Sequence, residues 1–189
     1  MGRGGAIICS FGTQHSLGQI ILVKKNFPFE INTEFSSNRI LTISFQTDRY
    51  KVNIINVYSP TQAHEKSIFL NNLSQHLNQL EGGVVLCGDF NCVLDNKLDI
   101  ISGEPHNIRN IENFKDFVIN HDLSDTWRLF HPEEKEYTWC RNNPFTSRRL
   151  DFIFTSNEIF NTTFSCNISS RQTLKRLKSV KPAHTVKTP

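Results

Sequence analysis

Long hydrophobic runs are absent from this sequence of 189 residues, in which apolar residues make up only 38%. The longest apolar stretches have the length of a strand, whereas a membrane-spanning helix needs about 20 consecutive apolar residues. The opening residues 1–6 lack the apolar core of a secretory signal peptide. We therefore expect an intracellular protein without a membrane span.

Paired cysteines are also missing, because the five cysteines form no CxxC motif. This pattern argues against a zinc ribbon and against a disulfide framework, and it predicts reduced thiols.

Acidic residues are absent after Glu158, whereas residues 171–189 contain six lysines and arginines. The rest of the chain keeps 15 basic and 18 acidic residues, a net charge of −3, while the whole chain carries +3. The alternatives for such a basic end are a solvated terminus or a contact with nucleic acid. We predict one domain over residues 1–168 and a basic, disordered tail over residues 169–189.

Many short apolar segments and two amphipathic ones predict an α+β fold. We expect two stacked, mostly antiparallel sheets with helices on their outer faces. Helices are predicted from Phe69 to Leu80 and from Asn110 to His121, and residues 95–107 read as a loop. Strands are predicted over residues 6–10, 17–25, 39–45, 51–58, 83–87, 136–141, 148–155 and 162–168.

The tetrapeptide Gly88–Asn91 (GDFN) follows directly on one of these apolar runs. In extended geometry Asp89 and Asn91 point to the same face, so a carboxylate and an amide stand together at a strand end. A carboxylate orients a nucleophile or holds a hard cation, and an amide donates to a developing oxyanion. The alternative is that both residues only begin a turn.

Two further polar residues lie in or beside apolar strands. Asp151 interrupts the run Arg149–Phe154 (RLDFIF), where an unpaired charge is costly. Tyr58 ends the segment Asn56–Pro60 (NVYSP), and by itself reads as a tyrosine at the rim of the surface.

Four motifs in this order resemble the endonuclease/exonuclease/phosphatase superfamily, which has the DNase I-like fold. They are NVYSP at 56–60, GDFN at 88–91, YTW at 137–139 and RLDFIF at 149–154. A further segment, LSDTWRLFHP at 123–132, lies between GDFN and YTW. With it, the motif sequences are most similar to those of the endonuclease domain of a non-LTR retrotransposon polyprotein. The related cellular enzymes are the apurinic/apyrimidinic endonucleases.

The resemblance implies Mg²⁺-dependent hydrolysis of DNA phosphodiesters, with Mn²⁺ as an alternative metal, in the nucleus. It implies that Asp89 aligns the attacking water and binds metal, and that Asn91 stabilises the transition state. Tyr58 would contact the scissile phosphate, and Asp151 would position the general base or the metal. Trp139 and Arg148 would contact the DNA backbone, with core packing and a solvated turn as their respective alternatives.

The chain also departs from the family pattern. Family members carry an Asn strand and a Gln-Glu strand before the matched region, and an Asp-His pair after it. We find no counterparts here, and His184 is the only later histidine. The resemblance thus predicts a piece of the family domain with impaired activity. The alternatives are a catalytically inactive nucleic-acid-binding relic or another phosphodiesterase or phosphatase branch.

Overall fold

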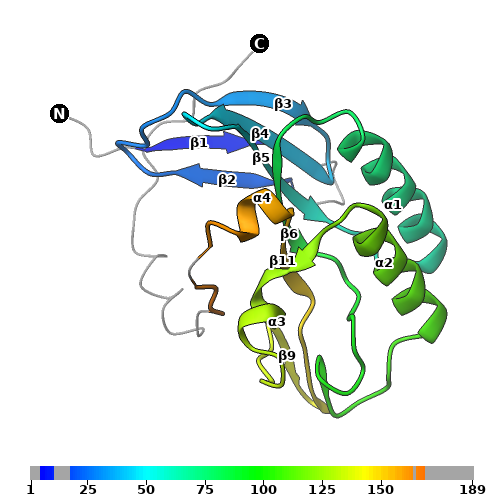
Figure 1. Cartoon of the computed structure of the whole chain (residues 1–189). Coiled ribbons are helices and arrows are strands. Elements are labelled where there is room, and N and C mark those ends of the chain that lie inside the picture. Colours follow the sequence, from blue (N-terminus) through cyan, green and yellow to red (C-terminus); the bar gives the residue numbers. More distant parts are fainter. Residues whose placement is uncertain (1–4, 11–17, 164, 169–189) are drawn as a thin grey trace.

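The computed structural model describes residues 5–10, 18–163 and 165–168 (Figure 1). None of the helices within these ranges combines the length and the apolar character needed to cross a membrane. Residues 169–189, including the predicted tail and His184, lie outside the described part.

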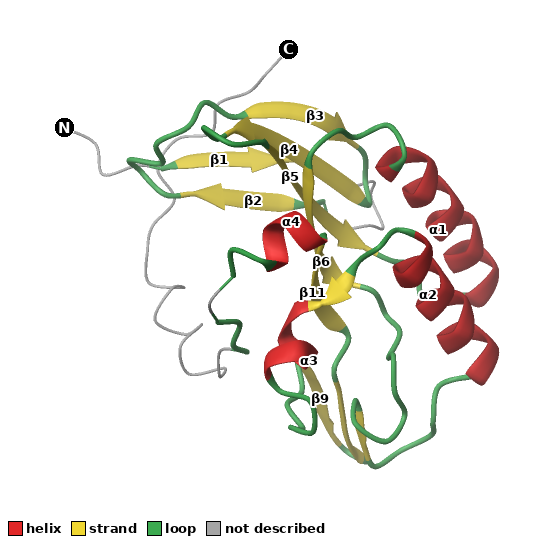
Figure 2. Ribbon diagram, in the orientation of Figure 1, coloured by secondary structure: helices red, strands yellow, loops and turns green. Residues whose placement is uncertain are grey.

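A six-stranded sheet forms the centre of the molecule, in the order β3-β4-β5-β6-β11-β8 (Figure 2). Every pairing in it is antiparallel except the parallel pair of β5 and β6. The strands are β3 (Asn32–Ser36), β4 (Ile40–Gln46), β5 (Lys51–Tyr58), β6 (Gly83–Asp89), β8 (Ser124–Asp125) and β11 (Asp151–Thr155).

Two smaller sheets accompany it. The hairpin of β1 (Ala6–Cys9) and β2 (Ile20–Val23) contacts β5, because Asn56 Nδ2 donates to the Ile20 carbonyl at 3.3 Å. The other sheet has the order β7-β10-β9 and joins β7 (Ile100–Ile101), β9 (Trp139–Asn142) and β10 (Phe145–Arg148).

Helices α1 (Ala63–Leu77) and α2 (Ile108–Asn120) pack side by side against one face of the central sheet (Figure 1). Their apolar residues recur every three or four positions, so each helix presents one apolar stripe to the sheet. The Asn107 side chain caps α2 by accepting from the Arg109 backbone N–H at 2.9 Å. The short helices α3 (Thr126–Phe130) and α4 (Asn157–Phe160) flank β11.

The core between these helices and the sheet is rich in phenylalanine. Phe90, 1% exposed, stacks on Phe114 with ring centroids 4.8 Å apart and meets Phe152 and Phe154 edge-on. Phe90 thereby anchors the turn that carries Asp89 and Asn91. The predicted α+β class with mostly antiparallel pairing is confirmed.

The strand predicted over residues 148–155 is wrong in one important respect. The structure divides it into β10 and β11, with Arg149 and Leu150 between them. Arg149 is turned into a buried ion-pair cluster, which interrupts the extended run. Arg148 and Asp151 consequently belong to different sheets.

Other boundaries also differ from the sequence-based expectations. The predicted loop 95–107 contains the short strand β7. Strand β3 was not predicted, because its sequence NTEFS is mostly polar and all five of its residues are exposed. Residues 126–130 form the short helix α3, for which no helix was predicted. The strand predicted over residues 162–168 is wrong for its described residues, which form a turn after α4 and then irregular chain.

Candidate active site

Three of the predicted site residues form one row across the central sheet. Tyr58 at the end of β5 pairs with Asp89 at the end of β6, and Asp89 pairs with Asp151 at the start of β11. Residues directly opposite one another in neighbouring strands point to the same face, with their Cβ atoms about 4.5–5.5 Å apart. A hydroxyl and two carboxylates therefore stand side by side on the face opposite the helices.

Asn91 lies in the turn just after Asp89 and has a left-handed backbone with φ of 48°, so the extended geometry predicted for residues 89–91 is wrong. Its backbone N–H donates to Asp89 Oδ1 at 2.8 Å, and its side-chain Nδ2 donates to the Ser59 carbonyl at 2.8 Å. An amide nitrogen carries two hydrogens, so Nδ2 keeps one for another acceptor. The turn thus ties the end of β5 to the end of β6.

Gly88 allows this close arrangement of β5 and β6. Its φ is 132°, and a Cβ at this position would lie 2.1 Å from the Val57 carbonyl oxygen. A side chain there would therefore force the two strands apart.

The charge of Asp89 is disfavoured by its surroundings. Burial raises the pKa of this carboxyl group, and the negative charge of Asp151 raises it further. The hydrogen bond from the Asn91 backbone and the positive charge of Lys66 act in the opposite direction on this pKa. Such opposing influences on a half-buried carboxylate are typical of functional sites.

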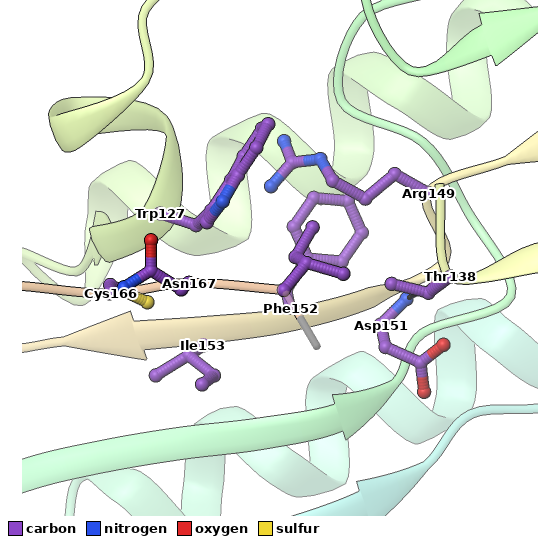
Figure 3. Close-up of a pocket in the computed structure, with 9 residues that line it drawn as sticks. Trp127, Thr138, Arg149, Asp151, Phe152, Ile153, Cys166 and Asn167 are labelled. Carbon is purple, nitrogen blue, oxygen red and sulfur yellow. Dashed lines mark hydrogen bonds between the residues drawn. The ribbon is translucent and has the colours of Figure 1, made fainter. Parts of the chain in front are cut away.

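Asp151 points away from the buried side of β11. Figure 3 shows its carboxylate near the end of β6, with Trp127, Arg149 and the Phe152 ring on the other side of the β11 ribbon. These groups and residues 166–168 line a mainly apolar cavity of about 190 Å³. Asp151 stands at the edge of this cavity.

Thr138, from the YTW motif, fixes the position of Asp151. Its hydroxyl oxygen accepts from the backbone N–H groups of Leu150 and Asp151, at 3.0 Å each. It therefore holds the chain at the point where it passes from β10 to β11.

Trp139 and Arg148 face one another as a pair between β9 and β10. Trp139 is 38% exposed and is therefore not packed in the core, which was the alternative for this residue. Arg148 is bound rather than solvated: Nη1 meets His106 Nε2 at 3.0 Å and Nη2 donates to the Glu104 carbonyl at 2.8 Å. Arginine is a donor only, so His106 Nε2 accepts; burial and the Arg148 charge lower the pKa of His106 to about 4.

Sequence analysis missed two basic residues near this row. Lys66 on α1 is buried and donates to the Asn91 carbonyl at 2.6 Å, although its neighbours read as the exposed side of a helix. Arg39 lies with its guanidinium 5.6 Å from the centre of the Tyr58 ring and donates to the Tyr58 carbonyl at 3.2 Å. Both contacts join segments far apart in the chain, so no local pattern signals them.

The donor set can accommodate Mg²⁺, which uses one or two protein carboxylates together with water and substrate phosphates. Asp89 and Asp151 supply two adjacent carboxylates, and in the described ranges no side chain donates to that of Asp151. The same part of the chain brings no three histidine, cysteine or acidic side chains together as a cation site. Among the described residues, Asp89 and Asp151 are thus the two neighbouring carboxylates that could hold such a metal.

The model of the Endonuclease/Exonuclease/phosphatase family matches residues 3–172, most of the chain. The chain belongs to this family. Members of the endonuclease/exonuclease/phosphatase family are hydrolases, and the arrangement of two carboxylates and an amide at strand ends suits that chemistry.

Individual relatives agree with this assignment. The uncharacterized 149 kDa protein of transposon TX1 from Xenopus laevis is 24% identical over 170 residues, which are 87% of this chain and 13% of that protein. The chain thus spans only a small part of this relative. The predicted resemblance to retrotransposon sequences is confirmed.

Solved structures show the same fold. The endonuclease domain of TRAS1, a telomere-specific non-LTR retrotransposon, has a TM-score of 0.64 at 11% identity, over 85% of this chain and 70% of that one. The catalytic domain of Xenopus laevis APE2 has a TM-score of 0.64 at 18% identity, over 85% of this chain and 69% of that one. The predicted DNase I-like fold is confirmed.

Proposed function

We propose that the chain is a metal-dependent endonuclease that nicks DNA, of the kind encoded by non-LTR retrotransposons. The observation that carries this proposal is the row of Tyr58, Asp89 and Asp151 across three neighbouring strands. The relatives support the choice of DNA as substrate, because one is the endonuclease domain of a retrotransposon. The proposal includes a nuclear location, which is where such an element would meet chromosomal DNA.

Each residue of the site has a defined task in hydrolysis of the phosphodiester. Asp89 accepts a hydrogen bond from the attacking water and orients it toward phosphorus. Asn91 donates its remaining amide hydrogen to a phosphoryl oxygen, on which negative charge is concentrated during attack. The Tyr58 hydroxyl binds another oxygen of the same phosphate.

A bound Mg²⁺ or Mn²⁺ would neutralise charge on the phosphate and the leaving oxygen. Asp89 and Asp151 would hold it. Because the described residues bring only these two carboxylates together, we expect weak metal binding before DNA arrives, and therefore slow nicking.

Trp139 and Arg148 bind the DNA backbone beside the scissile phosphate. The exposed indole offers a surface for stacking, and the guanidinium is held in place by His106 and Glu104. A fixed guanidinium loses less conformational freedom when it binds a phosphate.

Nicking of supercoiled plasmid with Mg²⁺ tests the proposal. We expect slow, EDTA-sensitive conversion to the open circle, and a loss of at least about 100-fold in Asp89→Asn and Asp151→Asn. Asp116→Asn on the exposed face of α2 is the matched control and should keep full activity. Equal loss in the control, or activity that resists EDTA, would contradict the proposal.

Two other outcomes point to the alternatives. DNA binding without any nicking would identify an inactive binding relic. Release of phosphate from a 3′-phosphorylated oligonucleotide in the absence of nicking would place the chain in a phosphatase branch of the family.

A further inference from the structure

Lys66 carries a buried charge that the proposed chemistry does not use. It is 6% exposed on the side of α1 that faces the sheet, and it donates to the Asn91 carbonyl at 2.6 Å. Among the residues that the structure describes, no carboxylate lies within 4.0 Å of its ammonium group. Burying an ammonium group without an adjacent anion is costly, and burial lowers the pKa of Lys66.

Asp89 is the carboxylate with which this charge interacts. Lys66 and Asp89 attract one another although they form no direct ion pair. The ammonium also adds a third contact to Asn91. The Asn91 backbone N–H donates to Asp89, its side chain donates to Ser59, and its carbonyl accepts from Lys66. Asn91 is thereby held on three sides in a left-handed conformation, which asparagine adopts more readily than most non-glycine residues do.

We propose that Lys66 is a positioning residue of the candidate active site. Its ammonium holds the backbone of Asn91 in place for donation to the phosphate, and its charge weakens the attraction of Asp89 for a divalent cation. This inference rests on the function proposed above, but its metal-binding part can be measured without nicking.

The two effects predict opposite changes when the charge is removed. Lys66→Met has a similar volume and no charge, so the site should bind Mn²⁺ more tightly, by roughly three- to thirtyfold. The kcat of nicking should nevertheless fall by about 10- to 100-fold with little change in KM, because Asn91 loses one of its three restraints. A residue that only supports the fold would not produce this split.

The thermal stability of the variant gives a further distinction. Replacing a buried, incompletely paired charge by an apolar side chain is often neutral or stabilising. We therefore expect the Tm of Lys66→Met to equal or exceed that of the unaltered protein. Lys66→Gln, which is also uncharged, serves as a second variant if Lys66→Met does not fold.

The experiment combines calorimetric titration with MnCl₂, plasmid nicking and thermal melting on the full chain. Lys66→Arg keeps the charge and should retain the original Mn²⁺ affinity and much of the kcat. Lys115→Met on the exposed face of α2 is the matched control and should leave all three measurements unchanged.

Several results would overturn the inference. Unchanged or weaker Mn²⁺ binding in the uncharged variants would exclude the electrostatic role, as would the absence of binding in every protein. Tighter binding with unchanged kcat would exclude the positioning role. If the unaltered chain does not nick at all, the proposed function fails, and the Mn²⁺ titrations still decide the electrostatic role of Lys66.

Discussion

Asp89 is the residue on which the most interactions of the candidate site converge. Its carboxylate accepts from Asn91, stands opposite Asp151 and is attracted by Lys66. Burial and the neighbouring carboxylate raise its pKa above the usual value of 3.8. The folded protein therefore pays for keeping this group ionised at neutral pH, which is expected of a residue placed for function.

This raised pKa predicts the effect of Asp89→Asn on stability. A carboxyl group whose pKa is raised in the folded state favours folding while it is protonated. The folded protein therefore loses stability as the pH rises from 3.8 through the folded-state pKa of this group. Asparagine does not titrate and can still accept the Asn91 hydrogen bond. We expect Asp89→Asn to unfold at a higher temperature than the unaltered protein at pH 7, with the difference disappearing toward pH 3.

Thermal melts of both proteins across this pH range provide the measurement. Asp116→Asn is the control, because its carboxylate is exposed and should show no comparable pH-dependent gain. Lower stability of Asp89→Asn at pH 7 would mean that the charge of Asp89 stabilises the fold, and would contradict the prediction.

At the level of elements, the passage from β10 to β11 decides where Asp151 stands. Thr138 is the clamp of this passage, since one hydroxyl oxygen serves two successive backbone N–H groups. Arg148 stays with the small sheet, while Asp151 joins the central one. Two residues only three positions apart thus reach the candidate site from different sheets.

Thr138→Val tests whether the hydroxyl of Thr138 stabilises this passage through its hydrogen bonds or whether its side chain does so through packing alone. The two side chains are similar in size, but valine leaves the Leu150 and Asp151 N–H groups without their acceptor. We expect a loss of about 1–3 kcal/mol in the free energy of unfolding, measured by urea denaturation, and slower nicking. Thr138→Ser keeps the hydroxyl and should lie close to the unaltered protein; equal losses in both variants would exclude the clamp.

At the level of the whole molecule, a buried ion cluster joins segments from three regions of the chain. Arg149, 1% exposed, donates from Nε to Asp99 at 2.8 Å and from Nη1 and Nη2 to Asp125 at 3.1 and 2.6 Å. Asp99 also accepts from Arg128 at 2.8 Å, and the Trp127 ring lies next to both guanidinium groups. The cluster therefore fixes the 94–99 loop and β8 against the start of β11.

Arg149→Met should destabilise the protein strongly, because it leaves Asp99 and Asp125 with fewer counter-charges in a buried setting. We expect a loss of about 3–5 kcal/mol in the free energy of unfolding by urea denaturation. Arg109→Met, on the exposed first turn of α2, is the control. A loss below about 1 kcal/mol in Arg149→Met would indicate that apolar packing rather than the ion cluster holds these segments together.

The basic segment 171–189 gives a prediction about DNA binding by the whole chain. Each phosphate contact by lysine or arginine contributes about 0.9 to the slope of log K against log salt concentration. If this segment binds DNA, its deletion should reduce the magnitude of that slope in fluorescence anisotropy titrations. An unchanged slope would assign it no role in binding.

The sequence by itself determined the fold class, most strand and helix positions, and the residues with the right chemistry at strand ends. These features follow from local periodicity and from motifs such as GDFN and RLDFIF, which can be recognised from a short stretch of neighbouring residues. The predicted roles of Tyr58, Asp89, Asn91 and Asp151 remain predictions that the proposed experiments address.

Only the tertiary structure decided which of these residues meet. The row of Tyr58, Asp89 and Asp151 depends on the register of β5, β6 and β11, and register is set by packing between segments distant in the chain. The burial of Lys66 has the same origin, because it depends on which face of α1 meets the turn after β6. Local sequence cannot contain this information, since the partners that bury a charge or align a strand lie about 25 to 60 residues away.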